Sequence, residues 1–205
     1  MYPFMINIEG KKIVVIGGGK VAAKRVHSLL RWQPHITIVS PNLHESLHEV
    51  IDSHDNVRYY ERSFQSSDVE QAFLVIAATN DSTINQIVKD SCHSNQLINI
   101  VDDPAGSSFH FPAFYEKNDI TVAVSTNGTS PSLGVQLRDE FAAIIEELEP
   151  QYITFLKEFR AAIKCSELSP IDKRYWLKEV LKDEYRHSEQ KRQQLKEQLL
   201  ANAII

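Results

Sequence analysis

Cysteine and long hydrophobic runs are both scarce in this sequence of 205 residues. The two cysteines, Cys92 and Cys165, are far apart and neither belongs to a Cys-x-x-Cys pair, so no zinc site or disulfide framework is indicated. No apolar run is long enough to span a membrane, and the first residues lack the basic and apolar regions of a signal peptide. We expect a cytoplasmic protein with buried or neutral thiols, no resident metal and no membrane partner.

Charge of one sign is not in large excess, because the formal net charge is only −5. The charges are nevertheless unevenly distributed. Residues 1–150 hold 11 Lys and Arg against 19 Asp and Glu, whereas residues 151–205 hold 11 against 8. This change of sign near Pro150 predicts a second structural unit, which is either a solvated helical tail or a basic surface that meets an anionic ligand.

Glycine is also scarce, yet three of the seven glycines are consecutive, at 17–19. The five residues before them, 12–16, are mostly β-branched and predict a buried parallel strand, and residues 20–30 predict a helix. The pattern is Gly-x-Gly-x-x-Ala, in which Gly17 permits a tight turn, Gly19 lets backbone approach a pyrophosphate, and Ala22 lets the helix lie close to the strand.

The first turn of this helix is a candidate anion site. Its unpaired backbone amides, at about Gly19, Lys20 and Val21, would face the phosphates with the positive end of the helix dipole behind them. We therefore predict that Gly17, Gly19, Lys20 and Val21 bind a dinucleotide. The alternative is a glycine-rich turn without a ligand.

Strands and helices alternate behind this motif. Such alternation is typical of a Rossmann-type α/β domain built on a parallel sheet. Further strands are predicted at 35–40, 57–60, 72–78 and 97–101, and helices at 43–51, 68–71 and 82–94.

The second predicted strand ends in Ser40, Pro41 and Asn42. In NAD-binding folds an acidic residue near this point usually binds the ribose hydroxyls, and an arginine accommodates the extra phosphate of NADP. Neither residue type is present here, so this position leaves the choice between NAD and NADP open. Pro41 and Asn42 remain candidates for cofactor binding.

The next two strands also deliver polar residues to the carboxyl edge of the sheet, where ligands of open α/β folds bind. The fourth strand ends at Thr79, Asn80 and Asp81, and the fifth at Asp102 and Asp103. Thr79 and Asn80 are therefore further cofactor-binding candidates. Asn80 or Asp81 is also expected to cap the helix that follows.

The pattern changes after Asp103. Two extended runs, 109–115 and 120–125, predict an antiparallel hairpin rather than another strand-helix-strand step. Ser130 is the predicted N-cap and Pro131 the first residue of the next helix. The rest of the chain is predicted to be helical, at 132–148, 152–164, 170–185 and 187–201.

Six motifs occur in one order: Tyr-Pro-x-Phe, Val-Val-Ile-Gly-Gly-Gly-Lys-Val-Ala, Ala-Ala-Thr-Asn-Asp, Asn-Ile-Val-Asp-Asp-Pro, Phe-His-Phe-Pro-Ala and Val-Ala-Val-Ser-Thr-Asn-Gly-Thr-Ser-Pro. Together they resemble the precorrin-2 dehydrogenase family, which includes the N-terminal half of bacterial siroheme synthase. The resemblance covers about residues 1–150 strongly and the remainder only by its helical character. Without the methyltransferase module of the long synthases, the chain resembles a stand-alone form.

The resemblance implies NAD-dependent oxidation of precorrin-2 to sirohydrochlorin in siroheme biosynthesis. It also implies an NAD-binding Rossmann domain at 1–112, a hairpin and helix that form a homodimer at 113–149, and a helical domain at 150–205 that helps to enclose the tetrapyrrole. Some members of this family also insert ferrous iron into sirohydrochlorin, and nothing in the sequence decides whether this chain does.

Asp102 matches the functional aspartate of the family, so the resemblance implies a catalytic role in accepting a proton or pairing with a pyrrole N–H. The alternative for Asp102 is a turn residue that holds Pro104 in place. Asp103 is expected to be a turn residue. Ser125 and Thr126 match a serine-rich segment of the family that lines the substrate site. His110 and Arg138 are further substrate-binding candidates, with a structural histidine and an ion-paired arginine as the alternatives.

Two other function classes are compatible with a dinucleotide motif. The first is a redox-sensing regulator whose basic C-terminal helices bind DNA. The excess of positive charge in these helices is small, and their basic residues are interleaved with acidic ones, so we expect no nucleic-acid partner. The second is a Rossmann oxidoreductase with another small substrate, against which only the family resemblance argues.

Overall fold

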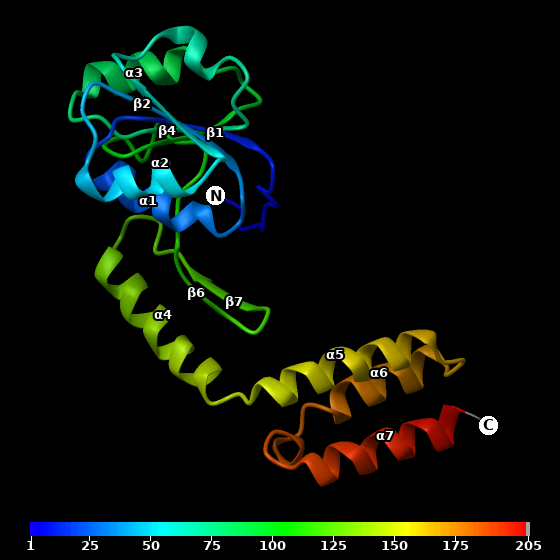
Figure 1. The fold of residues 1–205 in the computed structure, drawn as a ribbon. Coiled ribbons are helices and arrows are strands. Elements are labelled where there is room, and N and C mark those ends of the chain that lie inside the picture. Colours follow the sequence, from blue (N-terminus) through cyan, green and yellow to red (C-terminus); the bar gives the residue numbers. More distant parts are fainter. Residues whose placement is uncertain (204–205) are drawn as a thin grey trace. The chain divides into compact units, whose positions relative to one another are not determined.

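The computed structural model describes residues 1–203, which form two compact units (Figure 1). The first unit is Met1–Phe111, and the second begins at Pro112. No helix within the described residues is both long and apolar enough to cross a membrane.

A five-stranded parallel sheet forms the centre of the first unit, in the order β3-β2-β1-β4-β5. This order confirms the predicted Rossmann-type α/β fold. The strands are β1 Lys12–Ile16, β2 His35–Ser40, β3 Val57–Glu61, β4 Leu74–Ala77 and β5 Leu97–Ile100. The predicted strand over 72–78 was too long, because β4 covers only Leu74–Ala77 and Ala72 N–H bonds instead to the Val69 carbonyl of the preceding turn.

Both faces of the sheet are buried, as expected for a parallel sheet. Successive residues of β1 point to opposite faces, so Ile13 and Val15 lie in one hydrophobic cluster and Val14 and Ile16 in another. Helix α1, Lys20–Leu30, supplies Ala22, Ala23, Val26 and Leu29 to the first cluster.

Helix α1 spans the predicted residues, but the other helical segments of this unit differ from the prediction at their bounds. The segment predicted as a helix over 43–51 forms a 3₁₀ turn at Glu45–Leu47 and then α2 at His48–Ser53. It starts late because His44 is extended and caps the turn through its ring. The turn predicted at 68–71 lies at Ser66–Val69, where Gln65 and Asp68 form a capping box. Helix α3, Ser82–Asp90, stops four residues early, at the turn in which Cys92 N–H bonds to the Lys89 carbonyl.

The second unit opens with a hairpin of β6, Ala113–Lys117, and β7, Ile120–Val124. Its two turn residues, Asn118 and Asp119, both have positive φ, as hairpin turns that match strand twist require. The predicted first strand over 109–115 was wrong at its start. Phe109 and Phe111 instead pack against each other and against the hydrophobic core of the first unit.

Helices complete the second unit. Helix α4, Pro131–Glu146, begins as predicted, with the Ser130 hydroxyl accepting from Leu133 N–H and proline at the first position. It is followed by α5 Pro150–Cys165, α6 Pro170–Glu179 and α7 Glu189–Ala203. The single helix predicted over 170–185 was wrong, because the chain leaves the helix after Val180 and makes a 3₁₀ turn at Asp183–Tyr185 that buries Tyr185.

The two cysteines differ in exposure. Burial raises the pKa of the Cys92 thiol to about 11, so it is neutral at physiological pH, as predicted. Cys165 is exposed.

An ion pair stabilises the turn between β3 and β4. Arg62 donates two hydrogen bonds to Asp68, at 2.8 and 2.5 Å, and Gln65 N–H donates a third at 2.8 Å. The Asp68 side chain is only 8% exposed. These donors favour the ionised carboxyl, and the Arg62 hydrogen bond is the main reason that the pKa of Asp68 lies below its usual value.

We expect Asp68→Asn to lower the free energy of unfolding by about 1–3 kcal/mol at pH 7, because it breaks a charged hydrogen-bond pair. A depressed carboxyl pKa stabilises the fold above the unfolded value of about 3.9, and this contribution disappears as pH falls through the folded value. The deficit of the variant should therefore shrink between pH 7 and pH 3 in urea unfolding. The exposed Asp52→Asn is the control, and a deficit independent of pH contradicts the assignment.

Candidate dinucleotide site

A cavity of about 450 Å³ opens at the carboxyl edge of the sheet. It lies beside β1 and β4, where the chain order reverses and open α/β sheets bind their ligands. It has a size typical of small-molecule sites. Its lining comes from the ends of four strands and from α3: Ile16–Gly19, Val39–His44, Ser63, Phe64, Ala78–Asn80 and Ile84.

Two of the three glycines are required by the fold itself. Gly17 has φ +111°, and a Cβ there would lie 2.4 Å from the Ala78 carbonyl oxygen. A Cβ on Gly18 would lie 2.1 Å from the carbonyl oxygen of Asn42. The Gly18 carbonyl also accepts a hydrogen bond from His44 N–H at 2.7 Å. The glycine turn is therefore packed against the ends of β4 and β2.

Gly19 differs from its two neighbours. Its φ is −80°, and a Cβ there would meet nothing within 4 Å. Gly19 is the N-cap of α1 but has no side chain to bond the first-turn amides. The open space and the uncapped helix start, with Lys20 and Val21 exposed, suit a phosphate group. The residues present therefore fit a dinucleotide.

The end of β2 forms the next wall of the cavity. Pro41 and Asn42 line it, as does Ser40, whose hydroxyl accepts from Asn42 N–H at 3.4 Å. Among the residues that the structure describes, no lysine, arginine, aspartate or glutamate lines the cavity. Neither of the usual ribose-recognising charges is thus supplied by the lining residues.

The end of β4 also lines the cavity, through Thr79 and Asn80. Asp81 caps α3, since its carboxylate accepts from Thr83 N–H at 2.8 Å and from Ile84 N–H at 3.4 Å. The capping role that the sequence left to Asn80 or Asp81 thus falls to Asp81. Asn80 is exposed at the cavity.

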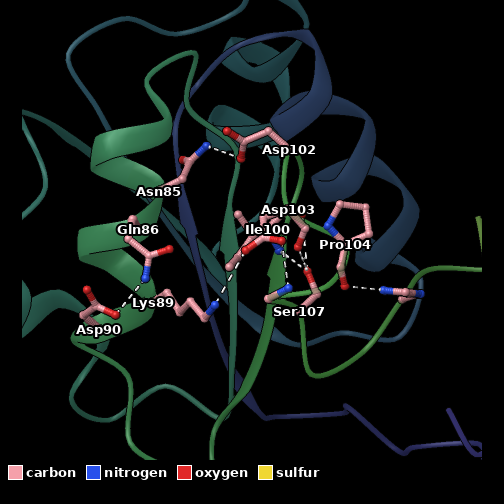
Figure 2. Close-up of polar contacts among 11 residues, drawn as sticks. Asn85, Gln86, Lys89, Asp90, Ile100, Asp102, Asp103, Pro104 and Ser107 are labelled. Atoms are coloured by element: carbon pink, nitrogen blue, oxygen red, sulfur yellow. Dashed lines mark hydrogen bonds and ion pairs between the residues drawn. The ribbon is translucent and has the colours of Figure 1, made fainter.

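Asp102 follows β5 and is linked to this edge by Asn85 of α3 (Figure 2). The Asn85 amide donates to Asp102 Oδ1 at 2.8 Å, and its oxygen accepts from Thr79 N–H and the Thr79 hydroxyl. Asp102 itself is exposed. Its carboxylate is therefore accessible and tied to a cavity-lining strand end.

The loop after Asp102 holds the other candidates of this unit. Asp103 accepts from Gly106 N–H at 2.8 Å and lies 3.6 Å from Lys89, as expected of a turn residue (Figure 2). The His110 ring lies 3.0 Å from the Pro104 carbonyl, to which it donates. His110 thus ties down this loop, and substrate binding by it stays a prediction.

The remaining candidates lie in the second unit. Ser125 is exposed, and its hydroxyl bonds only locally, to Asn127. The Thr126 hydroxyl donates a hydrogen bond to the Ser130 carbonyl and accepts one from Ser130 N–H, so it shapes the loop before α4. Arg138 Nε lies 2.6 Å from the Asp139 carboxylate. Arg138 therefore forms an ion pair, which the sequence left open as the alternative to substrate binding. Their roles toward a substrate stay predictions.

Sequence reasoning missed several residues at this edge. His44, Ser63 and Phe64 line the cavity, and Asn85 joins two strand ends. The cavity residues lie in loops without a local motif. Asn85 did carry a signal, because it lies inside the helix predicted over 82–94, where asparagine is unfavourable.

Three family models match consecutive parts of the chain. Residues 4–113 match a putative NAD(P)-binding family, residues 117–144 the central part of sirohaem biosynthesis proteins, and residues 150–195 the SirC C-terminal domain. The first match covers the sheet and the cavity described above. The chain is thus a Rossmann-type protein of the NAD(P)-binding family.

Curated relatives give a narrower assignment. A precorrin-2 dehydrogenase of Priestia megaterium is 28% identical over 97% of this chain and 98% of its own length. Siroheme synthases of Actinobacillus pleuropneumoniae serotype 7 and Zymomonas mobilis are 31% and 34% identical over 79% of this chain, which spans only 33% and 34% of their lengths.

A solved structure agrees with these relatives. The structure titled SirC, precorrin-2 dehydrogenase, has a TM-score of 0.81 and 28% identity, and the match covers 98% of this chain and all of that one. The chain belongs to the precorrin-2 dehydrogenase family, as its motifs indicated.

Gly19→Ala should separate cofactor binding from folding. Because the added methyl group meets open space in the structure, we expect the unfolding free energy to change by no more than about 0.5 kcal/mol. If a pyrophosphate lies against this residue, the dissociation constant of NAD⁺, measured by calorimetry, should rise about 10-fold or more. Gly18→Ala is the matched control, with a loss of about 1–3 kcal/mol in stability from overpacking. Unchanged affinity in Gly19→Ala contradicts the predicted pyrophosphate position.

Proposed function

We propose that this protein is an enzyme of siroheme biosynthesis that oxidises precorrin-2 to sirohydrochlorin with NAD⁺. The observation that carries the proposal is the position of Asp102, which is exposed and tied to the edge of a cavity that fits a dinucleotide. The names of its full-length relatives supply the substrate. We place the reaction in the cytoplasm, where NAD⁺ is available.

The cofactor supplies the hydride acceptor when it is bound. The residues of the chain hold it: the open face at Gly19 and the α1 amides would contact the phosphates, while Thr79 and Asn80 would lie along its nicotinamide half. We propose NAD⁺ rather than NADP⁺, because no lysine or arginine lines the cavity to pair with a 2′-phosphate.

The oxidation removes a hydride from a ring carbon of precorrin-2 and a proton from the macrocycle. We propose Asp102 as the group that accepts this proton, since a carboxylate at this edge can act as a general base. His110, Ser125, Thr126 and Arg138 are the proposed substrate contacts, through hydrogen bonds and ion pairs to the carboxylates of the tetrapyrrole.

We expect the purified protein, incubated anaerobically with precorrin-2 and NAD⁺, to form NADH and sirohydrochlorin in stoichiometric amounts. Asp102→Asn should lower kcat by about 10²-fold or more, the usual contribution of a general base, with little change in NAD⁺ affinity. Asp103→Asn is the matched control, because it alters the adjacent turn carboxylate and should retain kcat.

Absence of sirohydrochlorin with bound NAD⁺ would reject the proposed reaction and favour a regulator or another oxidoreductase. Replacing NAD⁺ by NADP⁺ tests the cofactor preference. Ferrous ion added after the oxidation tests whether siroheme forms faster than without protein, which is the second activity that the sequence left open.

We further propose that the segment 113–149 forms a homodimer. The hairpin has only two strands, so each strand has an edge without a partner within the described residues. On α4, Leu133, Leu137, Phe141 and Ile144 recur at helical spacing, and three of them are 45–56% exposed. A second copy of the chain would cover this stripe.

Phe141→Glu should shift the protein from dimer toward monomer, because it places a charge in the proposed apolar contact. Molar mass measured by light scattering after size exclusion is the readout. Ala143→Glu puts the same charge on an exposed position of α4 outside the stripe and should leave the dimer intact. A monomeric wild type, or an equal effect of both substitutions, contradicts this interface.

A further inference from the structure

Asn85 is an unusual residue for its place in the fold. It lies in the middle of α3 and is only 1% exposed. Asparagine lowers helix stability, and burial of its amide is costly unless every polar atom has a partner. Leucine or valine would fill such a position at lower cost, as Val88 does one turn later.

The hydrogen bonds of Asn85 use both ends of its amide. Its Oδ1 accepts from Thr79 N–H at 3.1 Å and from the Thr79 hydroxyl at 2.8 Å. A backbone N–H can only donate, so it fixes which end of the amide faces Thr79. The opposite end is therefore the NH₂ group, which donates to the Thr79 carbonyl at 3.2 Å and to Asp102 Oδ1 at 2.8 Å.

This bond restrains an otherwise exposed carboxylate. The β5 ladder ends at Ile100, and Asp102 lies two residues beyond it (Figure 2). The bond from Asn85 engages Oδ1 of Asp102. Within the described residues, no hydrogen bond or ion pair engages Oδ2. One oxygen is held while the other stays open toward a ligand.

We propose that Asn85 is a positioning residue for the dehydrogenase reaction, which holds the Asp102 carboxylate in register with the Thr79 edge of the cofactor cavity. This inference rests on the proposed function. Positioning a proton acceptor matters because a misplacement of about 1 Å can cost on the order of 10²-fold in rate. The buried, fully bonded amide is the rigid support that such a residue requires.

The chemistry of an asparagine suits this role. Thr79 needs an acceptor and Asp102 a donor, and a single amide supplies both. An aspartate at this position would keep the acceptor for Thr79 but present a second oxygen to the Asp102 carboxylate. A shorter or apolar side chain would reach neither partner.

Asn85→Asp is consequently the sharpest substitution, with Asn85→Ala as the second variant in case a buried charge prevents folding. Anaerobic kinetics with precorrin-2 should show kcat about 10-fold to 100-fold lower in either variant. The dissociation constant of NAD⁺ should change less than about threefold in Asn85→Asp, which keeps the contact to Thr79 N–H.

The matched control is Gln96→Leu. Gln96 is also a buried amide, 8% exposed, and it donates to the carbonyls of Val69 and Ala72 at the opposite, amino end of β5. It should lose stability but keep kcat.

A double-mutant cycle separates positioning from a merely structural role. If Asn85 acts through Asp102, Asn85→Ala should cause little further loss of kcat in an Asp102→Asn background. The inference would be overturned if the losses of kcat from the two substitutions multiplied in the double variant. It would also be overturned by full kcat in a folded Asn85 variant, or by the same loss of kcat in Gln96→Leu. A wild type that binds NAD⁺ but does not turn over would instead overturn the proposed function, and this inference with it.

Discussion

The structure of the first unit depends on how closely backbone can pass backbone at one end of the sheet. Gly17 and Gly18 lie so near the ends of β4 and β2 that a Cβ on either would clash with a carbonyl oxygen. This packing places the start of α1 directly against the cavity. Gly19 lies outside this packing, because a Cβ there would meet no atom within 4 Å, and we propose that the cofactor uses this space.

A second constraint acts across the neighbouring strands. Parallel strands end at one edge, but nothing in a sheet ladder fixes the side chains that follow the strands. Here Asn85 joins the second residue beyond β4 to the second residue beyond β5. The side chain of Asn85 thus connects two loops that follow different strands, as the proposed reaction requires of the groups around its reacting atoms.

The second unit is held together by different contacts from the first. Its hairpin and α4 are held by pairing and by contacts such as those from Tyr115 and Lys117 to Glu146. The helices after Pro150 have their own core around Phe159 and Trp176. The change of charge near Pro150 therefore coincides with a change of hydrophobic core. Separate family models match residues 117–144 and 150–195, while Ile120 of β7 packs against the helical core within the same unit.

Local patterns in the sequence were sufficient for the strands of the parallel sheet, the glycine turn, the Ser130 cap and the family. Each depends on residues that are close in the chain, or on the order of motifs along it, so no knowledge of distant contacts is needed. The carboxyl edge of the sheet was also predictable, because parallel strands must end together.

Only the tertiary structure decided what depends on distant partners. Gly18 is required because Asn42 packs against it, and Phe109–Phe111 leave the hairpin because the hydrophobic core of the first unit accepts two aromatic rings. Asn85 gains its role from Asp102, seventeen residues away. Such contacts are set by how whole elements pack, and a linear pattern carries no record of that packing.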